Sequence, residues 1–175
     1  QTVMTQREAM VARKRREKAV LRRLSLLLVA VVLLASCDGT VYHRFEQVDS
    51  AGWAASDTLS FMYDGSSVAA GAAVAVAVQL RYAAAYEYKN MCVCVETSKA
   101  GGGLLSVDTL CCAIYDDDGR RLGAIAGTMY QNGSDAVVLP AVCSDTLCLK
   151  VSHIMDGDTL RGVYDVGVKL TMVKR

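Results

Sequence analysis

Residues 73 to 80 read AVAVAVQL, and this stretch decides the fold. Every second position from Val74 to Leu80 carries a branched aliphatic side chain, and the other face carries three alanines, Ala73, Ala75 and Ala77. Alanine is the best helix former, so residues 69–80 could instead form a helix, but strict alternation favours a strand. Because the second face consists of small alanines, we expect a central strand that is covered on both sides.

Two segments on the C-terminal side alternate in the same way. They span residues 90–96 and 108–115, and the glycines between them predict a hairpin. A two-residue turn at 102–103 would place Cys94 opposite Cys111. This register predicts that the two cysteines are neighbours, either joined in a cross-strand disulfide or reduced and packed as small hydrophobes.

Further alternating segments are bounded by turn residues, and they span residues 41–47, 57–63, 122–130, 136–142, 145–153 and 165–173. The first suits an edge strand, 122–130 is read as one glycine-interrupted strand, and Asn132-Gly133 as a turn. Together with the strands above, this gives about 8–9 short strands. The sequence therefore predicts an all-β fold, an antiparallel β-sandwich of jelly-roll-like type.

A different pattern precedes the strands. Residues 24–37 read LSLLLVAVVLLASC, directly after a basic segment. The uncharged apolar run has signal-peptide length and is shorter than the roughly 20 residues of a spanning helix. Its end, Leu34-Ala35-Ser36-Cys37, resembles the bacterial lipobox, in which a peptidase cuts before the cysteine.

This resemblance implies a division of the chain into three parts. We expect residues 1–36 to be a cleavable lipoprotein signal helix and Cys37 to carry the lipid, so that residues 37–40 form the lipidated residue and a short tether. Residues 41–175 would then form the sandwich domain. The alternative is an uncleaved membrane anchor with an incidental cysteine.

Charge and cysteine content limit the function of the mature part. Residues 1–36 carry eight Lys and Arg and two acids, which leaves 11 basic and 16 acidic residues after them. This balance argues against nucleic acid as a partner. Six cysteines besides Cys37 would lie outside the cytosol, where disulfides can persist. With two histidines and no Cys-x-x-Cys, we expect no structural zinc and no cofactor.

Catalytic signals are also missing from the sequence. No Gly-x-Ser-x-Gly elbow occurs, and His43 and His153 lie on strand-like segments without a motif around them, so both are read as surface or rim residues. The acidic turns at 116–118 and 156–158 do not follow the EF-hand pattern and are read as solvated turns. We expect no catalytic residues and no metal ligands, and therefore no enzyme.

Aromatic residues are the remaining candidates for binding. A rim that could present flat faces to a sugar or a peptide would consist of Trp53, Arg81, Tyr82, Tyr86, Tyr88 and Asn90. The alternative is a structural role, since aromatic side chains are common in sandwich cores. Arg81 would then pin this region through carboxylate or carbonyl contacts.

An ordered set of residues runs from the lipobox to the last strand. It consists of Cys37, Tyr42, Phe45, Gly52-Trp53, Asp57, Phe61, Arg81, Tyr86, Tyr88, Asn90, Asp108-Thr109-Leu110, Asp118-Gly119, Gly123, Gly127 and Asp165-Val166-Gly167. In this order and spacing, the chain resembles the gliding-motility lipoprotein family GldH of the Bacteroidetes. The resemblance implies a non-enzymatic β-sandwich lipoprotein of the cell envelope, associated with the gliding machinery and type IX secretion.

Two functions follow as expectations. The first is an assembly or scaffold component whose partners are the membrane, through Cys37, and envelope proteins of the gliding or secretion apparatus. The second is a glycan-binding module that uses the aromatic rim. No acidic run follows Cys37, so we expect attachment to the outer membrane on its periplasmic side.

Overall fold

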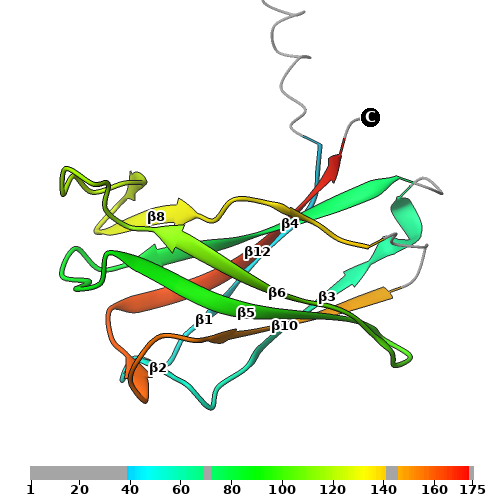
Figure 1. The fold of residues 1–175 in the computed structure, drawn as a ribbon, viewed down its shortest axis with the longest axis horizontal. Coiled ribbons are helices and arrows are strands. Elements are labelled where there is room, and N and C mark those ends of the chain that lie inside the picture. The colour runs from blue at the N-terminus through cyan, green and yellow to red at the C-terminus, as the bar shows by residue number, and fades with distance from the viewer. Residues whose placement is uncertain (1–38, 69–71, 141–145, 174–175) are drawn as a thin grey trace, which may run out of the picture. The chain divides into compact units, whose positions relative to one another are not determined.

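The computed structural model describes residues 39–68, 72–140 and 146–173, and Figure 1 shows the arrangement of its strands. The predicted signal peptide, Cys37 and Cys143 lie outside these residues. The described elements are β1 (Thr40–Gln47), β2 (Trp53–Ala54), β3 (Leu59–Asp64), the 3₁₀ turn η1 (Gly65–Ser67), β4 (Ala73–Tyr82), β5 (Asn90–Lys99), β6 (Leu104–Ala113), β7 (Ala124–Ala126), β8 (Met129–Gly133), β9 (Val137–Val138), β10 (Thr146–His153), β11 (Thr159–Leu160) and β12 (Val163–Val173).

The strands form two stacked antiparallel sheets. One has the order β1-β12-β4-β8-β7, with β9 also paired to β4, and the other has the order β3-β10-β5-β6. If the eight main strands of the described part are numbered along the chain, the sheet orders are first-eighth-third-sixth and second-seventh-fourth-fifth. This is the jelly-roll arrangement of two Greek keys. The predicted fold class is confirmed.

The alternating side chains of β4 contribute one row of residues to the hydrophobic core. Val74, Val76, Val78 and Leu80 are fully buried against the other sheet, as their spacing predicts. The strand is central, between β12 and β8, but the predicted cover of its second face is incomplete, since Ala75 is buried while Ala73 and Ala77 stay partly exposed. In a two-layer fold each sheet keeps one outer face, and the small alanines lie there.

The β5–β6 hairpin keeps the predicted faces in a shifted register. Cys92 lies opposite Cys111 and forms a disulfide with it, with Cα atoms 4.1 Å apart, while Cys94 faces Thr109 and is a free thiol. The predicted pairing of Cys94 with Cys111 is therefore wrong.

The physical reason is the turn. The chain reverses over residues 100–103, where Gly102 N donates to Lys99 O, and the pairing shifts by one residue next to Ser98. The resulting register differs by two residues from the one that a turn at 102–103 would give. A shift of two leaves every side chain on its face, so Met91, Val93, Leu110 and Cys112 are buried as expected.

A second correction concerns residues 122–133. The predicted single strand is a hairpin of β7 and β8, and the chain turns at Gly127, whose φ is +65°. Asn132 and Gly133 do not form a turn but lie in β8, opposite Leu80 and Gln79 of β4. Glycine therefore ends the strand here, where the sequence alone suggested a bulge.

Loops gather at two ends of the sandwich. We call the end with Gly39, loops 65–68 and 100–103, residues 138–140 beside the start of β4, and the end of β12 the tether end. Loops 48–58, 83–89, 114–123 and 154–162, which include the short pair β2 and β11, form the far end. In Figure 1 the red end of β12 and the green β5–β6 turn lie on the right, and the orange β11–β12 turn lies on the left.

Candidate functional site

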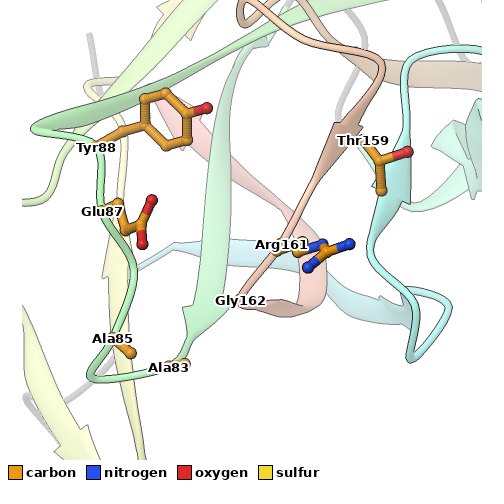
Figure 2. Close-up of a pocket in the computed structure, with 7 residues that line it drawn as sticks. All are labelled: Ala83, Ala85, Glu87, Tyr88, Thr159, Arg161 and Gly162. Atoms are coloured by element: carbon orange, nitrogen blue, oxygen red, sulfur yellow. The ribbon is translucent and has the colours of Figure 1, made fainter.

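A hollow of about 370 Å³ opens at the far end, between the β4–β5 loop and the β11–β12 turn. Figure 2 shows Glu87 and Tyr88 on one side of it, with Thr159 and Arg161 across from them. Its lining residues are Ala83, Ala85, Glu87, Tyr88, Thr159, Arg161 and Gly162. A carboxylate, a guanidinium and a phenol ring therefore border one space, and together they can accept and donate hydrogen bonds and offer an aromatic face.

A neighbouring hollow of about 480 Å³ shares Arg161 and Gly162 with the first. Residues 47–52 and Tyr164 form the rest of its lining together with Val163. Gly162 has a φ of +80°, a conformation that other residues rarely adopt, and it lets the chain turn tightly after β11. This turn leaves Arg161 exposed between the two hollows, with the exposed ring of Tyr164 beyond it.

Arg121 binds loop 83–89, which forms one wall of the first hollow. Its Nη2 donates to the carbonyl of Ala84 and to the hydroxyl of Tyr115. Its guanidinium also lies over aromatic rings, 4.6 Å from the centroid of Tyr130 and 4.7 Å from that of Tyr115. These cation–π contacts and hydrogen bonds join loop 114–123 to loop 83–89 and fix the wall of the first hollow.

The buried tyrosines behind this wall act as hydrogen-bond donors. Tyr82 Oη donates to Leu122 O at 2.9 Å and Tyr86 Oη to Asn90 O at 3.4 Å. Burial raises the pKa of Tyr82, against a smaller lowering by the nearby Arg121. Burial also raises the pKa of Tyr86, and the neighbouring Tyr88 adds to this. Both phenols therefore stay protonated and support the loops from inside.

The predicted aromatic rim is mostly core. Trp53, Tyr82 and Tyr86 are at most 2% exposed, and Trp53 Nε1 donates to Asp57 O at 3.0 Å. Among the aromatic residues of the predicted rim, only Tyr88, at 40% exposure, offers a face to a ligand. Asn90 begins β5 and accepts the bond from Tyr86 through its backbone. The placement favours the structural interpretation for these buried rings.

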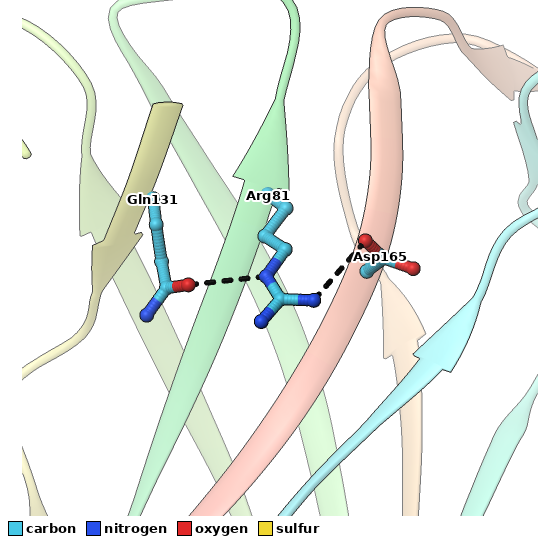
Figure 3. Close-up of polar contacts among 3 residues, drawn as sticks. All are labelled: Arg81, Gln131 and Asp165. Carbon is cyan, nitrogen blue, oxygen red and sulfur yellow. Dashed lines mark hydrogen bonds and ion pairs between the residues drawn. The ribbon is translucent and has the colours of Figure 1, made fainter. Parts of the chain in front are cut away.

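Arg81 lies on the outer face of the larger sheet, as Figure 3 shows. Its Nε donates to Gln131 Oε1 at 3.0 Å, and its Nη1 is 3.7 Å from the carboxylate of Asp165. The guanidinium stacks 3.9 Å from the ring centroid of Phe45, and that ring covers Gly167. Arg81 thus has the expected carboxylate contact, but it joins β1, β12, β4 and β8 and does not face the hollows.

His153 is not the rim residue that the sequence suggested. It is 4% exposed, its Nε2 lies 3.1 Å from Trp53 O, and its ring packs edge-on against the Trp53 indole. The alternation along β10 could have indicated this, because His153 continues the buried series of Leu147, Leu149 and Val151. His43 is exposed on β1, as expected.

Sequence reasoning missed the residues that border the hollows. Arg161, Glu87 and Tyr164 belong to loops or strand ends, where no periodicity distinguishes them. The same holds for Arg121, which does not line a hollow but bonds the loop that forms its wall. Residues 39–68, 72–140 and 146–173 contain no group of three His, Cys, Asp or Glu placed to hold a metal ion. The same part of the chain has no helix long and apolar enough to cross a membrane.

Two stacked antiparallel sheets with loop-walled hollows at one end define a jelly-roll β-sandwich domain. The GldH lipoprotein family model matches residues 40–170, from the start of β1 to the last buried residue of β12. The chain belongs to the GldH lipoprotein family, which confirms the resemblance seen in the sequence. Membership implies a lipid anchor and attachment to a membrane of the cell envelope, and it indicates no catalytic family.

Solved structures with a related strand arrangement are distant. A protein from Sulfurospirillum deleyianum is 6% identical, with a TM-score of 0.43, and the match covers 77% of this chain and 99% of that one. The Eiger TNF of S. frugiperda is 10% identical (TM-score 0.31; 78% and 94% covered), and the Drosophila NLP core is 13% identical (TM-score 0.25; 77% and 100% covered). No curated protein sequence matches the chain significantly.

Proposed function

We propose that the protein is a non-enzymatic envelope lipoprotein that serves as an assembly or scaffold component of the gliding or type IX secretion machinery. The observation that carries this proposal is the family match over almost the whole described domain. Residues 1–36 would be removed, and Cys37 would carry the lipid. The far end would contact the envelope partner through Arg161, Tyr88 and Tyr164.

The chemistry of the far end supports a protein partner. Tyr and Arg are enriched at protein interfaces, because each offers a large contact area together with hydrogen-bond donors. Tyr88 and Tyr164 are 40% and 46% exposed, and both lie beside the exposed Arg161. Hollows on both sides of an exposed arginine suit the protruding side chains of a folded partner.

Affinity capture from detergent-solubilised envelopes tests this proposal. The tagged full-length protein should retain specific envelope proteins, and Arg161→Ala should retain less of them. The matched control is Arg44→Ala, which removes another exposed arginine, 65% accessible and on β1. Equal capture by Arg161→Ala, Arg44→Ala and the parent protein would contradict a partner site at Arg161.

A glycan is the second candidate ligand for the same hollow. Tyr88, Glu87 and Arg161 together border a space of about 370 Å³, a combination that suits a sugar ring and its hydroxyls. A glycan array distinguishes the two proposals. Binding to defined glycans with no envelope protein captured would reverse their order.

We also propose attachment to the outer membrane on its periplasmic side. Protease treatment of intact cells tests the side: the protein should survive in intact cells and be cut after the outer membrane is opened. Digestion in intact cells would instead place the domain on the cell surface.

A further inference from the structure

The tether end carries five large exposed aliphatic side chains from both sheets: Met62 (52% exposed), Leu104 (64%), Val138 (55%), Met172 (41%) and Val173 (37%). The described part of the far end carries two, Ile125 and Ile154. The strands of the first five meet at the tether end: Met62 and Ser98 flank Cys148 of β10, Ser98 pairs with Leu104, and Val173 pairs with Ala73 at the start of β4. Large exposed apolar side chains from separate strands mark a contact surface.

The chain enters the domain at the same end. Gly39 O accepts a hydrogen bond of 2.9 Å from Met172 N, so the tether is fixed to β12 from Gly39 onward. Two peptide units then separate Cys37 from Gly39, a reach of about 7 Å at full extension. A lipid on Cys37 would therefore hold Met172 and its neighbours close to the bilayer surface.

Charge differs between the two ends. Within the described residues, the far-end loops carry eight acidic side chains, Asp49, Asp57, Glu87, Asp116, Asp117, Asp118, Asp156 and Asp158, against four basic ones, Lys89, Arg120, Arg121 and Arg161. The described tether-end segments 65–68, 100–103 and 138–140 carry no charged side chain, and the strands beside them end in one acid and one base, Asp64 and Lys99. Anionic lipid headgroups repel an acidic surface, so this contrast favours the tether end next to the membrane.

We infer that the tether end rests on the lipid bilayer, with Met62, Leu104, Val138, Met172 and Val173 in the headgroup region. The far end then points away from the membrane, about 25 Å from the anchor along β1. The occupant of the apolar surface is the bilayer itself. This inference depends on the lipid at Cys37, which belongs to the proposed function, and it adds the orientation of the domain.

Tryptophan reporters can test the orientation in the full, lipidated protein. Leu104→Trp and Val138→Trp place indoles on the proposed lipid surface, and Ile125→Trp is the matched control, since Ile125 is 74% exposed on β7 at the far end. All variants keep the buried Trp53 as a common background. The probe is a vesicle of phosphatidylethanolamine and phosphatidylglycerol with brominated acyl chains, which quench nearby indoles.

We expect the protein to float with the vesicles and the Leu104→Trp and Val138→Trp reporters to lose fluorescence, while the Ile125→Trp reporter keeps it. Two tether-end positions guard against one variant folding poorly, and circular dichroism checks each fold. Flotation with equal quenching at both ends, or with none, would overturn the orientation and leave the anchor intact. A protein that does not float would contradict both the anchor and the orientation.

Discussion

Arg120 and Arg121 are adjacent in sequence and differ in surroundings. Arg120 is 78% exposed and only 3.5 Å from Asp118 in a solvated ion pair, whereas Arg121 is half-buried among Tyr82, Tyr115 and Tyr130. The sequence DDDGRR gives no reason to separate the two. The difference arises because Arg121 lies among the rings of Tyr82 in β4, which is distant in the chain, and of Tyr115 and Tyr130.

Replacing Arg121 should therefore destabilise the domain. We expect Arg121→Ala to lower the free energy of unfolding by about 1–3 kcal/mol, because the carbonyl of Ala84 and the hydroxyl of Tyr115 lose a charged donor and the rings lose a cation. Arg120→Ala, the control, should change it by less than about 0.5 kcal/mol. Urea denaturation measures both. Equal effects would contradict the role assigned to Arg121.

Cys112 makes the domain sensitive to alkaline pH. Burial raises the pKa of this thiol from 9.0 to about 12, and its Sγ lies 3.7 Å from Val78 O. Above pH 9.0 the thiol ionises in the unfolded chain and stays protonated in the folded one, so the folded state holds more protons and stability falls as pH rises. Below pH 9.0 the Cys112 thiol is protonated in both states, so it does not make the stability depend on pH.

The expected slope for this group is a loss of about 1.4 kcal/mol in unfolding free energy per pH unit, between pH 9.0 and about 12. Tyr82 and Tyr86, whose pKa values are also raised, should add to it at higher pH. Denaturation curves of the parent and of Cys112→Ala across this range isolate the contribution of the thiol. An unchanged slope in Cys112→Ala would refute it.

At the scale of elements, alternation predicted which side chains face the core but not how the strands align. The faces of β4, β5, β6 and β10 agree with the sequence, since a period of two needs no knowledge of the partner strand. Register depends on the turn, and three consecutive glycines at 101–103 allow several turn geometries. The sequence therefore gave the correct faces for β5 and β6 and the wrong cysteine pair.

The disulfide gives a direct test of the observed register. Mapping of alkylated, unreduced protein by mass spectrometry should recover Cys92 linked to Cys111 and Cys94 as a free thiol. Replacing Cys92 and Cys111 together by serine should cost about 3 kcal/mol, the chain-entropy value for a loop of this length. Cys94→Ser, as control, should cost less. A recovered Cys94–Cys111 link would restore the register with the turn at 102–103.

For the whole molecule, the sequence predicted the sandwich and the family but could not predict the candidate site. Arg161 and Tyr88 are about seventy residues apart and meet only because β12 and β4 are neighbours in the larger sheet. Aromatic spacing pointed to Trp53, Tyr82 and Tyr86, since local sequence does not distinguish a buried ring from an exposed one. Which loops lie at the same end of the sandwich follows from the order and direction of the paired strands.

The jelly roll also places two groups of loops at opposite ends of the domain. The strands alternate in direction, so the loop after β1 lies at the far end while Gly39 and the end of β12 lie at the tether end. A lipid at Cys37 would act on one end only, and the far end would be free for an envelope partner. Both the proposed partner site and the proposed membrane contact depend on this anchor.

Lipid attachment at Cys37 is tested by the mass of the N-terminal peptide of the protein isolated from cell envelopes. We expect a peptide that begins at Cys37, carries a diacylglycerol on the thiol and lacks residues 1–36. An unmodified chain that retains residues 1–36 would contradict lipid attachment.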